Sequence, residues 1–130
     1  YQNNSIEKIK LVARAINNME FYCDDKVSSM VLTEDDFIKT GAKDEDTEGI
    51  INFGRDIQSV ELALLFKEST EDKVKVSLRS KNNIDVNVFA GEFGGGGHKS
   101  AAGATMPGDI STVKRTVLDK AFELFRVDKK

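Results

Sequence analysis

The chain of 130 residues is 39% hydrophobic and 32% charged, and its formal net charge is −3. We expect one soluble, cytoplasmic domain with no membrane partner, because the length suits a single core and because neither a membrane-spanning apolar run nor a signal-peptide pattern is found. Cys23 is the only cysteine and His98 the only histidine, which excludes a disulfide framework and a Cys/His zinc cluster.

Apolar spacing predicts the elements of the first half of the chain. Apolar residues recur at helical spacing from residue 5 to about residue 21, which predicts an amphipathic helix. Residues 27–33 favour a strand, and the next helix is expected to begin at residue 33 or 35 and to end near residue 41. After an acidic loop, Thr47 is expected to cap a helix that runs to about residue 56. Its predicted apolar face consists of Ile50, Ile51, Phe53 and Ile57.

The second half combines strands and helices. Alternating apolar residues predict strands at 60–66 and 74–78, joined by a polar hairpin loop. A helix at 84–93, a short strand at 104–106 and a helix at 110–124 follow. Helices interleaved with strands, together with one tight strand connection, predict a single small α/β domain with a mixed β-sheet.

The strand at 74–78 carries a polar face that is a candidate binding surface. Its period of two places Lys75, Ser77 and Arg79 on one side. Residues 73–100 carry five basic and two acidic side chains, whereas residues 34–48 carry seven acidic and two basic ones. An anion would prefer the basic region, where Arg79 can hold a phosphate or stack on a base. The alternative is that both charge runs, Arg79 included, are ordinary solvated surface.

An unbroken glycine run is the strongest motif. It consists of Gly94, Gly95, Gly96 and Gly97 and is followed by His98, Lys99 and Ser100. Ordering four glycines is unfavourable, so a folded domain needs a reason to keep them. Their N–H groups can form a concave anion nest, and the small residues after His98 favour a short helix whose N-terminus would point into it. The alternative is a tight turn with a helix-capping or core histidine; the spacing fits neither a Walker loop nor a dinucleotide fingerprint.

Two further features carry weaker indications. The acidic stretch 46–49, with Asn52, can orient a partner chain or stabilise the dipole of its own helix. Cys23 has no basic residue near it in the sequence, so we assign it no redox role.

Four segments together resemble one known family. They are FGGGGHKSAAG from residue 93, DTEGIINF from residue 46, VELALLF from residue 60 and KVSLRSK from residue 75. In this order they resemble the DHH-associated domain, type 1, of DHH-family phosphoesterases, over residues 26–126. The similarity is greatest to the branch with oligoribonuclease and 3′-phosphoadenosine-5′-phosphate phosphatase activity, which is also described as exopolyphosphatase-related.

The resemblance implies a division of labour between two domains. In the family, an N-terminal DHH domain binds two manganese ions and activates water, while the C-terminal domain closes over the substrate. The family's phosphate-binding roles fall here on Gly94 to Gly97, His98 and Arg79, with Lys99 and Ser100 as further donors. A single histidine excludes an Asp-His-His motif, so no catalytic or metal-binding residue is expected in this chain. Residues 1–25 are then a linker helix from a missing DHH domain, and residues 26–130 the substrate-binding domain.

The resemblance leaves several functions open. The first is the substrate-binding part of a manganese-dependent phosphodiesterase, with short RNA, adenosine bisphosphate, cyclic dinucleotide or polyphosphate as the substrate and the chain itself catalytically incompetent. The second is an RNA-binding module like the C-terminal domain of alanyl-tRNA synthetase. The third is an interaction domain whose glycine loop is only a turn. The absence of an aromatic ladder favours short phosphate ligands. Expected partners are the ligand and the N-terminal DHH domain; a homodimer is left open.

Overall fold

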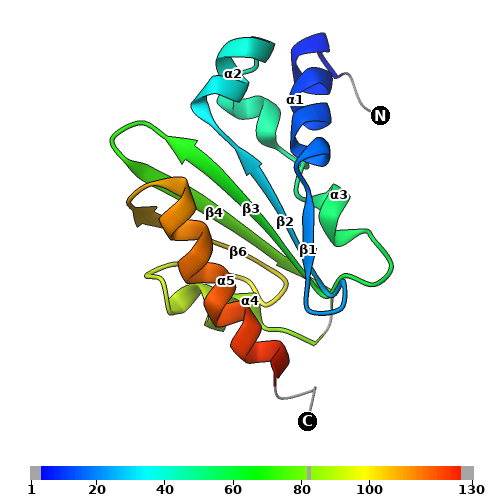
Figure 1. Ribbon diagram of the computed structural model, residues 1–130, viewed down its shortest axis with the longest axis vertical. Coiled ribbons are helices and arrows are strands. Elements are labelled where there is room, and N and C mark those ends of the chain that lie inside the picture. The colour runs from blue at the N-terminus through cyan, green and yellow to red at the C-terminus, as the bar shows by residue number, and fades with distance from the viewer. Residues whose placement is uncertain (1–3, 82, 127–130) are drawn as a thin grey trace.

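Six strands form one sheet in the order β1-β2-β3-β4-β6-β5, in a computed structural model that describes residues 4–81 and 83–126 (Figure 1). Strands β2 and β3 are parallel and the other pairs are antiparallel, so the predicted single α/β domain with a mixed sheet is confirmed. The elements are α1 (Ile6–Asn17), β1 (Glu20–Tyr22), β2 (Val27–Leu32), α2 (Glu34–Thr40), the 3₁₀ turn η1 (Asp44–Thr47), α3 (Asn52–Arg55), β3 (Leu62–Ser69), β4 (Lys73–Ser80), α4 (Val86–Gly91), β5 (Gly96–Gly97), β6 (Ala101–Pro107) and α5 (Ile110–Arg126).

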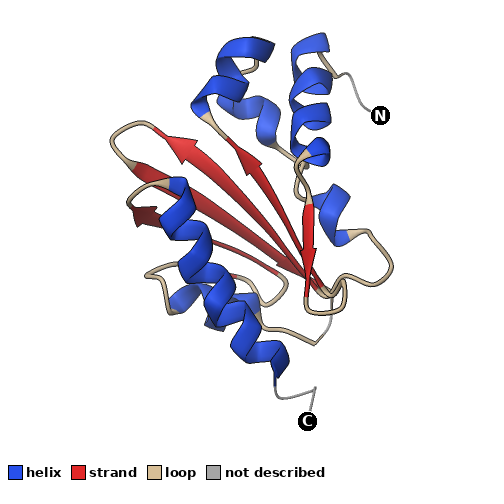
Figure 2. Cartoon of the chain, in the orientation of Figure 1, coloured by secondary structure: helices blue, strands red, loops and turns tan. Residues whose placement is uncertain are grey.

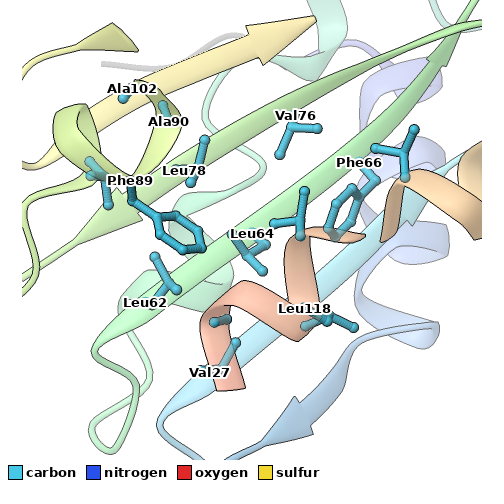
Figure 3. Close-up of a cluster of buried hydrophobic side chains, with 14 of the residues drawn as sticks. Val27, Leu62, Leu64, Phe66, Val76, Leu78, Phe89, Ala90, Ala102 and Leu118 are labelled. Carbon is cyan, nitrogen blue, oxygen red and sulfur yellow. The ribbon is translucent and has the colours of Figure 1, made fainter. Parts of the chain in front are cut away.

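Helices cover the two faces of the sheet unequally. One core lies between the sheet and helices α4 and α5, which Figure 1 shows together on the near side of the strands. Figure 3 shows its side chains, which include Leu64 and Phe66 of β3 and Leu78 of β4. A second core packs α1 and the segment that contains α3 against the other face of β2 and β3. No helix in the described ranges, 4–81 and 83–126, is long and apolar enough to cross a bilayer.

The first predicted helix is too long, because residues 20–22 form the edge strand β1 (Figure 2). Helix α1 ends at Asn17, and Asn18 caps it. The side-chain amide of Asn18 donates to the carbonyls of Arg14 (3.0 Å) and Val31 (2.8 Å) and accepts from the N–H of Val31 (2.9 Å). The amide of Asn18 therefore bonds the backbone of Val31 as a neighbouring strand would, and the residues that follow pair with β2 as strand β1.

The helix predicted from Thr47 to residue 56 is also wrong in extent. The structure has η1 at Asp44–Thr47, turns, and then only the four-residue α3. Gly49 lies between them at φ +83°, in the left-handed region that a continuing helix does not contain. The hydroxyl of Thr47 donates back to the carbonyl of Asp44 (2.7 Å) and does not cap a helix.

The short helix predicted after His98 is a strand. Residues 101–107 form β6, which pairs with β4 from Lys73↔Pro107 to Arg79↔Ala101. The small side chains of Ala102 and Ala104 are buried, which gives them a place in the sheet that outweighs the helical preference of alanine. The predicted strand 104–106 is thus the second half of β6. The ends of the expected linker helix and substrate-binding domain, residues 1–3 and 127–130, lie outside the described part of the chain.

Candidate functional site

A cavity of about 990 Å³ opens on the sheet face that α1 and α3 share. Lys75, Ser77 and Arg79 of β4 line it, as the alternation of that strand predicted. Their neighbours Val74, Val76 and Leu78 point the other way and are buried in the α4/α5 core. We call this cavity the β4 cleft. Its other walls come from α1, from residues 44–55 and from β3.

Arg79 lies partly buried in the β4 cleft without a carboxylate partner in the described residues. One of its guanidinium nitrogens, Nη1, donates to the carbonyl of Leu78 at 2.9 Å. Burial lowers the pKa of Arg79, and the positive charge of Arg55 lowers it further. A guanidinium stays protonated despite such a shift. Arg55 is paired with Asp56 (3.0 Å), whereas Arg79 has no carboxylate among the described residues, so the charge of Arg79 gives this wall a positive potential that an anion would relieve.

Lys67 and Lys75 are opposite each other on β3 and β4, at the other end of the β4 cleft. Lys67 forms an ion pair with Asp44 of η1. The hydrogen bond from Lys67 is the main cause of a lowered pKa of Asp44; burial opposes it, and the charges of Lys67 and Lys75 add to it. This pair ties η1 to the sheet and neutralises Lys67. Lys75 has no ion pair within the described ranges, so its charge adds to that of Arg79.

Helix α3 forms the wall that faces β4. Asn52, Phe53 and Arg55 line the β4 cleft, whereas Gly54 is buried against β2. A Cβ at Gly54 would lie 2.5 Å from the hydroxyl oxygen of Ser28, so this glycine lets the helix approach the sheet. The apolar-face prediction was wrong for Phe53, whose side chain is 50% exposed. The sequence analysis did not identify Phe53, Arg55 and Lys67 as residues of the cleft. For Phe53 and Arg55 the available signal was Gly49, because a glycine in the left-handed region ends the long helix that was assumed.

The glycine run is used by the fold itself. Gly94 has φ +80°, and a Cβ at Gly95 would overlap the carbonyl oxygen of Gly103. A Cβ at Gly97 would lie 2.6 Å from the carbonyl oxygen of Ala101. Three of the four glycines are thus required by a turn or by close approach to β6, while Gly96 pairs with Gly103 in the short strand β5.

Most N–H groups of the run already have acceptors inside the protein. Gly94 donates to Gly91 (3.2 Å), Gly95 to Ala90 (2.9 Å), Gly97 to the side-chain oxygen of Asn87 (2.9 Å) and His98 to Ala101 (2.7 Å). These donors are therefore not directed at an anion in the structure. These four N–H groups do not form the anion nest that the sequence predicted.

His98 lies at the tip of the hairpin between β5 and β6, and we call residues 98–101 the histidine turn. His98 and Ala101 exchange backbone hydrogen bonds of 2.7 and 3.3 Å, and Ala101 pairs with Arg79. Arg79, Ala101 and His98 are thus opposite one another on three adjacent segments, and residues paired in this way have their side chains on the same face of the sheet. With strands about 4.8 Å apart, the Cα atoms of His98 and Arg79 are about 10 Å apart. His98 is exposed and is not among the residues that line the β4 cleft.

Lys99 and Ser100 hold the histidine turn in place through their backbone carbonyls. The carbonyl of Lys99 accepts from the N–H of Val86 (2.8 Å), and that of Ser100 from the N–H of Ser80 (3.0 Å). The side chains of both residues are exposed. The turn is therefore fixed to the end of β4 and the start of α4, with the side chains of His98, Lys99 and Ser100 in solvent.

The acidic stretch 46–49 serves local structure. A carboxylate oxygen of Asp46 accepts from the N–H of Lys43 at 2.8 Å, and the carbonyl of Glu48 accepts from the ammonium of Lys8 at 2.9 Å. Both contacts are made within the chain, to Lys43 and to Lys8 of α1. Within residues 4–81 and 83–126, no group of three or more His, Cys, Asp or Glu side chains is placed to hold a metal ion. The described residues therefore do not fit a two-manganese centre of the kind that the DHH family has in its N-terminal domain.

Comparison with known proteins gives one family and several relatives. The DHHA1 domain matches residues 10–126. A bifunctional oligoribonuclease and PAP phosphatase, NrnA, from Thermus thermophilus is 30% identical over 115 residues, which are 88% of this chain and 34% of that protein. An exopolyphosphatase-related protein from Bacteroides fragilis superimposes with a TM-score of 0.85 at 30% identity, over 97% of this chain and 38% of the other.

A third likeness concerns the fold alone. The C-Ala domain of alanyl-tRNA synthetase from Aquifex aeolicus superimposes with a TM-score of 0.59 at 13% identity. The match covers 83% of this chain and 97% of that domain. The chain therefore spans little more than a third of the first two relatives but nearly all of the third.

Proposed function

This chain belongs to the DHHA1 domain family, and from that premise we propose that it is the substrate-binding part of a DHH phosphoesterase. Its ligand is a short oligonucleotide or a nucleotide bisphosphate. The Thermus relative is an oligoribonuclease and PAP phosphatase, which supports this substrate class. Hydrolysis belongs to an N-terminal DHH domain with manganese, so the chain itself is a binding module.

One observation carries the proposal: Arg79 stands in the β4 cleft with a second guanidinium near it and no carboxylate bound to it in the described ranges. A structural arginine in a partly buried place is normally paired with an acid. An unpaired one, beside the charge of Arg55 and on the same strand face as Lys75, suits a phosphate that supplies the missing negative charge.

The histidine turn supplies the second contact. His98 lies in the row of Arg79, so a phosphate near the rim of the β4 cleft can receive hydrogen bonds from both side chains. Lys99 and Ser100 add an ammonium and a hydroxyl from the same turn. The roles proposed for Gly94, Gly95, Gly96 and Gly97 are indirect, since the run lets the turn lie close to β6.

Binding experiments test this function on the 130-residue chain. We expect the dinucleotide pApA and 3′-phosphoadenosine 5′-phosphate to bind more tightly than a transfer RNA, measured by titration calorimetry. Arg79→Ala should weaken both small ligands about tenfold or more, since a hydrogen bond to a charged group contributes roughly 1.5–3 kcal/mol. Arg115→Ala is the matched control, because this exposed arginine lies on α5, against the opposite face of the sheet.

Two outcomes would contradict the proposal. Tighter binding of the transfer RNA would favour the RNA-binding alternative, for which the C-Ala likeness supplies only the fold. Equal binding by Arg79→Ala and Arg115→Ala would remove the β4 cleft from ligand binding altogether.

A further inference from the structure

Phe53 is an exposed aromatic side chain on the wall of the β4 cleft. In the described part of the chain, Phe21 and Phe53 are the two phenylalanines with large exposed fractions, 42% and 50%. Phe21 is on the edge strand β1 and does not line the cleft, whereas Phe53 does. Exposing an aromatic ring to water is unfavourable, and its place beside unpaired cationic and polar groups needs an explanation.

The position of Phe53 is fixed by its neighbours in the chain. Ile50 and Ile51 before it are buried in the second core, and Gly54 after it is packed against Ser28. Because the residues on both sides of Phe53 are packed in the core or against β2, the backbone that carries its ring is fixed. A ring held in this way loses little conformational entropy when a flat ligand stacks on it.

One polar side chain without a hydrogen-bond partner among the described residues and one arginine, which is paired with Asp56 at 3.0 Å, lie close to Phe53 in the chain. The side-chain amide of Asn52 makes no hydrogen bond within the described ranges, and it lines the same cleft. Arg55 follows two residues later, and its charge acts on Arg79 across the cleft. An aromatic face, an amide with free donors and acceptors, and cations nearby are together the groups that recognise a nucleobase joined to a phosphate.

We propose that Phe53 is the stacking platform for a nucleobase of the bound ligand, while Arg79 holds the phosphate of that ligand. This inference rests on the proposed function and specifies it: the β4 cleft selects nucleotides over polyphosphate, because polyphosphate has no base to stack. Asn52 lies where its amide can meet the polar edge of the base. The remaining occupant to consider is an apolar side chain of a neighbouring protein domain, and the experiment below separates the two.

The test compares two probes on the 130-residue chain labelled with ¹⁵N. The probes are pApA and inorganic pyrophosphate, each titrated by NMR. Phe53→Leu keeps an apolar side chain without a ring, Phe53→Tyr restores a ring, and Phe21→Leu is the matched control on the other exposed phenylalanine. We expect Phe53→Leu to weaken pApA about fivefold or more and to leave pyrophosphate within about twofold, because stacking acts on the base alone. Phe53→Tyr and Phe21→Leu should bind pApA like the unsubstituted chain.

Each contrary result has a definite meaning. Unchanged pApA binding in Phe53→Leu overturns the platform and leaves Phe53 to a protein partner. An equal loss of pApA and pyrophosphate overturns it as well, since the substitution would then act through the shape of the cleft. If Arg79→Ala keeps full affinity for both probes, the proposed function fails, while a loss of pApA alone in Phe53→Leu still supports the stacking role of Phe53. If neither probe binds the unsubstituted chain at millimolar concentration, both proposals are wrong.

Discussion

The two sides of β4 differ in their surroundings: one face packs in the core, and the other faces a cleft that we propose as the binding site. Val74, Val76 and Leu78 are nearly or fully buried against α4 and α5. The alternating positions Lys75 and Arg79 stand in a cleft, and neither has an ion pair among the described residues. The comparison teaches that the stability of β4 does not depend on the side chains of its polar face. The strand is stabilised by its backbone hydrogen bonds to β3 and β6 and by the side chains of its buried face. The polar face is thus available for a ligand.

The largest effect is expected from breaking the buried face. Leu78→Ala should lower the free energy of unfolding by about 2–5 kcal/mol, because Leu78 is 0% exposed and the substitution leaves a cavity. Denaturant unfolding followed by circular dichroism measures it. Ser77→Ala is the matched control on the cleft side and should stay within about 0.5 kcal/mol. Similar losses for the two variants would contradict the division between the faces.

A second variant tests whether the glycine run contributes to stability or to ligand binding. Gly95→Ala should destabilise the fold by about 1–3 kcal/mol, because the new Cβ would overlap the carbonyl oxygen of Gly103 and force the hairpin away from β6. Gly91→Ala is the control: no atom lies within 4 Å of a Cβ there, and the position ends α4. Thermal unfolding measures both variants. A neutral Gly95→Ala with weakened pApA binding would instead give the run a direct role at the ligand.

The histidine turn offers a variant that should affect binding alone. His98→Ala should weaken pApA about three- to tenfold, the effect of one hydrogen bond contributing roughly 0.5–1.5 kcal/mol. The free energy of unfolding should stay within about 0.5 kcal/mol, because the side chain is exposed. Calorimetric titration and thermal unfolding of the same sample measure the two quantities. Lost stability with unchanged affinity would make His98 a capping residue, the alternative that the sequence left open.

Periodic parts of the fold could be predicted from the sequence, and the parts set by distant contacts could not. Strands β3 and β4, helix α5 and the shared face of Lys75, Ser77 and Arg79 follow from local spacing. Of strand β6 only the second half, residues 104–106, was predicted, since residues 101–103 become a strand only through pairing with their neighbours in the sheet. The same holds for β1, which depends on Asn18 bridging to Val31.

The candidate site was predicted only in part, because local spacing reveals residues on periodic elements and not residues that are placed by distant contacts. Arg79 lies on a periodic strand, so its face was found, whereas Phe53 was assigned to the apolar side of a helix that Gly49 interrupts. A wrong helix length thus concealed the exposed ring. The glycine run was recognised as a motif, but its donors are used by the hairpin, which only the pairing with β6 reveals.

The smallest effect is expected where the cleft face contributes to stability, at the ion pair of Asp44 with Lys67. The pKa of Asp44 is lowered in the folded chain, mainly by the hydrogen bond from Lys67. A carboxyl whose pKa is lower when folded contributes stability above its unfolded pKa and loses it as the pH falls through the folded value. Asp44 is 76% exposed, so the contribution is screened and stays below about 1 kcal/mol.

Asp44→Asn should therefore reduce the free energy of unfolding slightly at pH 7 and not at all once the pH is below the folded pKa of Asp44. Raising the salt concentration should reduce the difference at neutral pH. Chemical unfolding of both proteins across the acid range measures it, with Asp56→Asn as the control at an exposed carboxylate paired with its neighbour Arg55. A difference that persists in acid would mean that the substitution disturbs η1 itself. Electrostatics on the cleft face would then contribute nothing to the stability that the buried face of β4 provides.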